Sequence, residues 1–274
     1  MKKILVAFDG SSFSKGALDY ALNFAAQLQS LIVGVFVEDL SYIGYATLFG
    51  DDYFAFDPKV LEQMENESAG KIEENIATFT ARCKEAGANF RTHLDKGVPA
   101  NELIYESRYA DLIILGYQTF FSSVTGEGSI LKDVLIDAES PVMAVPDQYK
   151  PIQNILLTFD GKAHSAFAIK QFTQLFPEKS LQASATLLTI AKSKEEANGT
   201  DLMKEYLTAH YSKLNYESLS GPAEESIMNF AEMQTNPLVV MGAYGRKGVF
   251  RFFSRSTAGK LLKDKSLPVF VAHK

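Results

Sequence analysis

Residues 3–10, KILVAFDG, return as residues 154–161, NILLTFDG, so the same apolar run ending in Asp-Gly occurs twice in the chain. Three further segments repeat in the same order: GVPA at 97–100 as GPA at 221–223, DLIILG at 111–116 as PLVVMG at 237–242, and PVMAV at 141–145 as PVFVA at 268–272. Four matches in one order indicate an internal duplication, which has to be recognised before a fold is assigned.

Each half alternates short apolar runs with amphipathic stretches. Residues 4–8 are typical of a strand buried on both faces, and residues 14–29 carry a helical apolar stripe. Such alternation predicts an α/β fold: two Rossmann-like domains, each a five-stranded parallel sheet flanked by helices. We expect the domains to span 1–147 and 151–274, joined by the turn-rich segment PDQYKP. The other expected strands of the first half are 31–37, 89–94, 112–115 and 142–145, and the other helices are 67–87, 99–109 and 129–138.

One segment, about 39–65, has no counterpart in the second half. Its first part, DLSYIGYATLFGDDYFAFDP, mixes aromatic residues with glycine and aspartate and fits neither a helix nor a clean strand. We expect a long surface loop, with a partner surface or lid as the alternative, because long loops in compact domains are often functional.

Composition excludes several classes of protein. Of 274 residues, 46% are hydrophobic and 22% charged, as in ordinary globular proteins. The single cysteine, Cys83, rules out an internal disulfide and fits a reducing compartment, so we expect a cytoplasmic protein. We find neither a signal-peptide pattern nor a run of 18 apolar residues, and therefore expect no contact with a membrane.

The net charge of −6 argues against general nucleic-acid binding, but it hides an asymmetry. Residues 1–147 contain 11 Lys and Arg against 22 Asp and Glu, whereas residues 148–274 contain 16 against 11. A polyanionic ligand should therefore prefer the second half.

Ligands of open α/β sheets bind at the carboxyl ends of the strands, where the strand order switches. Asp9 and Asp160 follow the first strand of each half, and Gly116 and Gly242 follow the fourth. An acidic residue and a glycine loop at adjacent strand ends indicate a nucleotide cleft.

With these segments, the chain resembles a tandem universal stress protein, two copies of that family's domain covering nearly all 274 residues. The resemblance rests on the ILVAFDGS opening, the glycine loop and the Pro-Val strand closing each half. It implies the adenine nucleotide alpha hydrolase-like fold. Nucleotide-binding members carry Gly, two residues, Gly, nine residues, Gly, then Ser or Thr; Gly242, Gly245 and Ser256 match, while Arg255 stands at the third glycine.

This glycine loop has a physical logic of its own. Glycines let backbone amides approach phosphate oxygens, and the helix expected to begin near Ser256 points its free N–H groups at the anion. Ser256 and Thr257 can donate hydroxyl protons, and the Arg255 guanidinium can contact a phosphate. The family pattern implies that Asp160 lies near the adenosine and that the backbone around Ile190 meets adenine. For Asp160, a turn or cap carboxylate is an equal alternative.

The first half has a degenerate version of the loop. Gly116-Tyr-Gln-Thr119 lacks the second glycine, and Gly128-Ser129 comes one residue early beside Glu127. We therefore give its equivalent positions, Asp9 and Phe36, less weight.

We expect a stress-response sensor or regulator that binds ATP, ADP or AMP mainly in its second half, with Mg²⁺ possible alongside the nucleotide. No catalytic residue or metal site is predicted, and hydrolysis is expected to be slow at most, because neither a general base nor a magnesium cage is evident. The alternatives are a scaffold that binds no nucleotide and acts through an unknown protein partner, and a true ATP-using enzyme. We expect the closing strands, 142–145 and 269–272, to be sheet edges that join the two halves as a pseudo-dimer. We also expect two chains to pair as a homodimer.

Overall fold

The computed structural model describes residues 1–8, 13–39, 58–117, 130–191, 199–242 and 267–273. The first half contains β1 (Lys3–Phe8), α1 (Lys15–Leu28), β2 (Leu31–Asp39), α3 (Pro58–Glu85), β3 (Phe90–Gly97), α4 (Pro99–Ser107), β4 (Leu112–Gly116), α6 (Ile130–Asp137) and β5 (Val142–Val145). The second half contains β6 (Asn154–Phe159), α7 (Ala163–Leu175), α8 (Glu178–Leu181), β7 (Ser184–Ala191), α9 (Thr200–Thr208), β8 (Leu214–Ser220), α10 (Ala223–Glu232), β9 (Pro237–Gly242) and β10 (Val269–Ala272).

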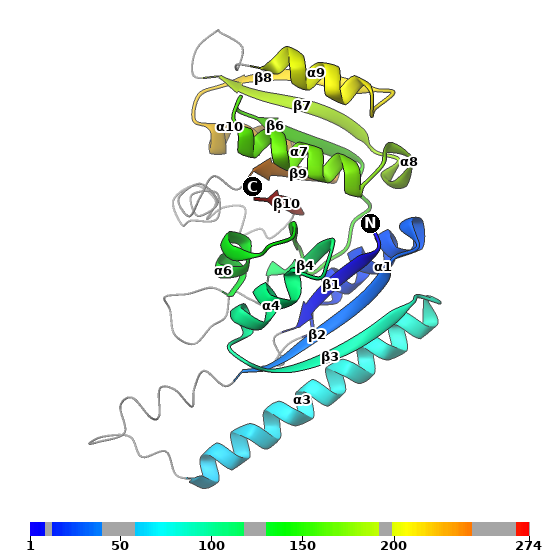
Figure 1. Cartoon of the computed structure of the whole chain (residues 1–274), viewed down its shortest axis with the longest axis vertical. Helices are drawn as coiled ribbons and strands as arrows, with labels where there is room; N and C mark the ends of the chain where they lie inside the picture. Colours follow the sequence, from blue (N-terminus) through cyan, green and yellow to red (C-terminus); the bar gives the residue numbers. More distant parts are fainter. Residues whose placement is uncertain (9–12, 40–57, 118–129, 192–198, 243–266, 274) are drawn as a thin grey trace, which may run out of the picture.

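The described strands form one ten-stranded sheet in the order β3-β2-β1-β4-β5-β10-β9-β6-β7-β8 (Figure 1). Each half contributes five neighbouring strands that run parallel, with its first strand in the middle, as expected for a doubly wound fold. The two halves meet where β5 and β10 pair antiparallel, with Phe270 opposite Met143. The closing strands are therefore edges only of their own halves and lie at the centre of the whole sheet.

Helices cover both faces of the sheet because successive strand residues point to opposite sides. Ile4, Val6 and Phe8 pack with α1, α3, α7 and α9 on one face. Leu5 and Ala7 pack with α4, α6 and α10 on the other. The continuous apolar run that repeats in the sequence is thus buried on both faces, as predicted.

Aromatic side chains join the two halves into one core. The Phe24 ring of α1 lies 4.9 Å from the ring of Phe176, just after α7. Phe176 stacks on Phe172, whose ring lies 5.2 Å from that of Phe270 in β10. Burying large rings across a junction stabilises it in proportion to the apolar area removed from water.

Helix α3 is longer than expected. It begins at Pro58, so the backbone of residues 58–65, predicted to belong to a loop, is helical. Proline suits the first turn of a helix, and no glycine or further proline follows until Gly70. Residues 40–57 of the same segment lie outside the described residues. Among the helices that are described, none is long and apolar enough to cross a membrane.

Candidate functional site

The carboxyl edge of the second half brings two predicted site residues together. Strands β6 and β9 are parallel neighbours, paired from Asn154 and Pro237 to Leu157 and Val240. Asp160 follows the end of β6, and Gly242 is the last residue of β9. Chain connections leave β6 on one side for β7 and reach β9 on the other, so the two residues flank the switch point of the strand order.

Asp160 organises the turn between β6 and α7. Its Oδ1 accepts the Lys162 N–H at 3.1 Å and lies 2.7 Å from the Ser165 hydroxyl, while Oδ2 lies 3.3 Å from Lys162 Nζ. Gly161 between them has φ +78°, the left-handed conformation that favours glycine. The turn role considered for Asp160 is thus present. Its side chain is 34% exposed, which leaves the carboxylate open to solvent on one side.

Gly242 packs against the start of α7. A β carbon on residue 242 would lie 2.5 Å from the carbonyl carbon and oxygen of His164 and 2.7 Å from the Ser165 nitrogen. The helix can approach the end of β9 this closely only because position 242 has no side chain.

The other predicted positions fare differently. Ile190 lies in β7. The residue before it, Thr189, pairs with Phe159 of β6, so the backbone of Ile190 is level with Asp160 one strand away. Gly245, Arg255, Ser256 and Thr257 lie outside the described residues.

Three polar residues at this edge were missed by the sequence analysis: Lys162, Ser165 and His273. The first two act through short local contacts with Asp160. His273 follows β10, where Ala272 pairs with Gly242, and its Nε2 is buried without a hydrogen-bond partner among the described residues. No motif contains His273, because only the fold brings it beside β9.

Burial lowers the pKa of the His273 imidazole and favours its neutral form. The neighbouring His164 acts in the same direction, whereas the Asp137 carboxylate, at the end of α6 in the first half, acts against it. The edge of the candidate site therefore borders the junction between the halves.

Phe36, the first-half position given less weight, is not level with Ile190 in the structure. It pairs with Phe8, as Thr189 pairs with Phe159, so it lies one residue before the position that corresponds to Ile190. Its ring is fully buried and stacks on Phe8 with centroids 4.7 Å apart, so it belongs to the core. Asp9 lies outside the described residues.

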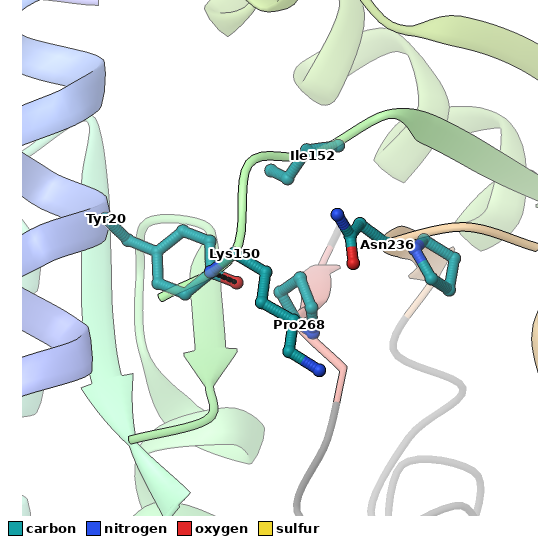
Figure 2. A pocket seen from close by; sticks show the side chains of 6 residues that line it. Tyr20, Lys150, Ile152, Asn236 and Pro268 are labelled. Carbon is teal, nitrogen blue, oxygen red and sulfur yellow. Dashed lines mark hydrogen bonds between the residues drawn. The ribbon is translucent and has the colours of Figure 1, made fainter. Parts of the chain in front are cut away.

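A small hollow at the opposite edge is unrelated to this site. Figure 2 shows it between Tyr20 of α1, the linker residue Lys150, and Ile152, Asn236 and Pro268 of the second half. Ile152, Asn236 and Pro268 precede β6, β9 and β10, so the hollow lies at the amino ends of the strands. Within the described ranges no group of three His, Cys, Asp or Glu side chains could hold a metal ion.

Comparisons with known proteins give one family for both halves of the chain. The model of the universal stress protein family matches residues 1–146 and again 152–273. The universal stress protein Slr1230 of Synechocystis is 26% identical over an alignment of 288 positions, which covers 98% of this chain and 99% of that protein. Protein MJ0531 of Methanocaldococcus jannaschii, also named a universal stress protein, is 28% identical over 53% of this chain and 81% of its own length. The crystal structure of a universal stress protein from Archaeoglobus fulgidus superposes with TM-score 0.72 at 18% identity, covering 99% of this chain and 96% of that one.

Proposed function

The chain belongs to the universal stress protein family, and from that premise we propose that it binds ATP or another adenine nucleotide, chiefly in its second half. It then acts in the stress response as a sensor or regulator, with hydrolysis slow at most. This role needs a site that can recognise an adenosine and a phosphate chain together.

The observation that carries the proposal is the placement of Asp160 and Gly242 at adjacent carboxyl strand ends, on either side of the switch point. A partly exposed carboxylate there can accept hydrogen bonds from ribose hydroxyls or an adenine amine. The Ile190 backbone, one strand along, can supply peptide groups to the base. We assign the binding of the nucleotide's phosphates to Gly245, Arg255, Ser256 and Thr257. Any Mg²⁺ would be bound by those phosphates.

Charge supports the preference for the second half. Lys162 places an ammonium group with a half-exposed side chain at the mouth of the site, where the first half has Ser11 at the equivalent position. The second half also carries the positive part of the sequence asymmetry. A cationic environment raises the local concentration of a polyphosphate and strengthens its binding.

Native mass spectrometry of the purified full chain, mixed in turn with ATP, ADP and AMP, tests the proposal. One nucleotide per chain is expected. No bound nucleotide at concentrations well above those in cells would contradict it, and two equivalent nucleotides per chain would contradict the preference for the second half.

A second candidate function is a scaffold that acts through protein contacts. It is favoured by Tyr105 and Tyr109 on α4, which are 55% and 61% exposed and lie with ring centroids 5.9 Å apart. Tyrosine and arginine are enriched at protein interfaces, and Arg108 lies over the Tyr105 ring. Absence of nucleotide in the experiment above would favour this role.

Other assignments go with the proposal. We place the domains at 1–147 and 151–274, and the protein in the cytoplasm. A homodimer also stays a prediction, and it would need a surface other than β5 and β10, because these strands pair within the chain. Light scattering with size-exclusion chromatography measures that oligomeric state.

A further inference from the structure

A second group of titratable side chains lies in the first half, between the outermost strand β3 and helix α4 (Figure 1). His93 Nδ1 of β3 lies 2.7 Å from Glu106 Oε1 of α4. The other carboxylate oxygen of Glu106 lies 3.9 Å from Lys3 Nζ at the start of β1. Asp95 follows His93 by two residues and so points to the same face of the sheet. These groups link three elements, far from the candidate nucleotide site.

Asp95 is half-buried, and one of its carboxylate oxygens is shielded from solvent. Its Oδ2 is buried and has no hydrogen-bond partner among the described residues. Burial raises the pKa of the Asp95 carboxyl above its usual 3.8; the nearby Glu106 carboxylate raises it further, and His93 acts in the opposite direction. The Asp95 carboxyl therefore holds its proton to a higher pH than the carboxyl group of an exposed aspartate does.

The surroundings contain more acidic than basic groups. On this face, α4 also presents Glu102, whose carboxylate packs against Gly97 at the end of β3. Strand β2 ends at Asp39, which pairs with Gly97, and β3 itself adds Arg91. The excess of 22 acidic over 11 basic residues in positions 1–147 acts in the same direction. Among the residues that the structure describes on this face, Lys3 and Arg91 are permanent cations, and Asp39, Asp95, Glu102 and Glu106 are carboxyl groups.

We propose that His93, Asp95 and Glu106 form a proton-responsive clasp that fastens β3 to α4 more tightly in acidic than in neutral solution. Protonation of Asp95 removes its repulsion from Glu106, and its new O–H can donate a hydrogen bond. A carboxyl whose pKa is raised on folding stabilises the folded form at low pH, and this contribution is lost as the pH rises through the raised value.

The second half lacks this arrangement. Counted from Gly97 and Gly221, Glu217 and Leu219 take the places of His93 and Asp95. Counted from Pro99 and Pro222, Asn229 takes the place of Glu106. The first half, whose glycine loop is degenerate, would thus respond to protons and not to nucleotide. The matching unit of the second half, β8 with α10, serves as an internal control.

Hydrogen exchange of the full chain, followed by mass spectrometry and corrected for the intrinsic exchange rate, tests the clasp. Asp95→Asn imitates the protonated side chain. Glu38→Gln is the matched control, because Glu38 pairs with Lys96 at 2.7 Å on the opposite face of the same strands. In the natural chain and in Glu38→Gln, protection of β3–α4 relative to β8–α10 should rise about threefold or more as the pH falls from about 7 to about 4, because the Asp95 carboxyl has a pKa above its usual 3.8. In Asp95→Asn it should be high at both pH values.

A flat ratio in the natural chain, or an equal rise in Asp95→Asn, would overturn the proposal. A carbon-13 NMR titration of the Asp95 carboxyl in the folded chain gives a second measurement. A midpoint above 3.8 is expected, and a midpoint at or below it would overturn the clasp as well.

Discussion

Gly242 at the end of β9 touches the peptide of His164 in α7: a β carbon on residue 242 would lie 2.5 Å from the carbonyl carbon and oxygen of His164. This contact sets how closely the start of α7 approaches the strand ends that flank the candidate site. The sequence suggested that Gly242 is there to let phosphate approach. Its contact in the structure is with a helix, so the same residue shapes the site by packing.

Replacing Gly242 with alanine should force β9 and α7 apart. We expect Gly242→Ala to lower the free energy of unfolding by about 1–3 kcal/mol, the usual cost of overpacking, and to weaken nucleotide binding. Urea denaturation followed by circular dichroism measures the first effect. Gly70→Ala is the control, because a β carbon at Gly70 in α3 meets nothing within 4 Å. That change should leave the stability equal or raise it by up to about 1 kcal/mol. Equal losses in both variants would contradict the packing role.

The aromatic contacts across the junction predict that the halves unfold together. Phe176→Ala should lower the free energy of unfolding by roughly 3–5 kcal/mol, because it leaves a cavity between Phe24, Phe172 and Phe270. Calorimetry should give one transition for the natural chain and one, at a lower temperature, for the variant. Leu202→Ala, at a side chain 73% exposed, should change stability by less than about 0.5 kcal/mol. Two separate transitions in the natural chain would contradict a shared core.

Because the Tyr20 hydroxyl is buried, we expect the protein to lose stability in alkaline solution. Burial raises the pKa of its hydroxyl to about 12, the nearby Tyr149 adds to this, and the hydrogen bond from the Lys150 N–H acts against it. Above about pH 10 the unfolded tyrosine releases its proton while the folded one keeps it, so stability falls as the pH rises toward about 12. The rise of the Tyr20 pKa to about 12 corresponds to about 2–3 kcal/mol of stability.

Denaturation midpoints measured at intervals from about pH 8 to about pH 11 test this expectation. Tyr20→Phe should show a smaller alkaline loss than the natural chain. Tyr216→Phe, at a side chain 43% exposed in β8, should keep the natural slope. Indistinguishable slopes in all three proteins would mean that Tyr20 does not contribute.

The regular part of this fold could be predicted from the sequence for a physical reason. Strands such as β1 and β6 are buried on both faces, so their apolar runs are continuous and the repeat is visible. The same logic placed Asp160 and Gly242 at one edge, because parallel strands end together.

What the sequence did not reveal depends on contacts between distant or irregular parts. The start of α3 was hidden because Pro58 follows a segment rich in aromatic residues and glycine. His273 joins the site edge only through the pairing of β10 with β9. The bonds of Asp160 to Lys162 and Ser165 need the left-handed Gly161, which no apolar pattern reports. The contact of His93 with Glu106 likewise requires α4 to pack on β3.

The role of Asp160 in binding has to be separated from its role in the turn. Ser165→Ala removes the hydroxyl that lies 2.7 Å from Asp160 Oδ1 but keeps the carboxylate. It should lower stability by about 1 kcal/mol, as for a lost hydrogen bond, and leave nucleotide affinity within about threefold. If Ser165→Ala weakens binding as much as Asp160→Ala does, the carboxylate acts by supporting the turn and not by contacting the ligand.

Isothermal titration of ATP into the natural chain, Asp160→Ala and Asp9→Ala tests the central claim most directly. We expect one site per chain, an affinity reduced roughly tenfold to hundredfold by Asp160→Ala, and no change with Asp9→Ala, since a hydrogen bond to a charged group contributes about 1.5–3 kcal/mol. Equal losses in the two variants, or no binding by the natural chain, would contradict a nucleotide site in the second half.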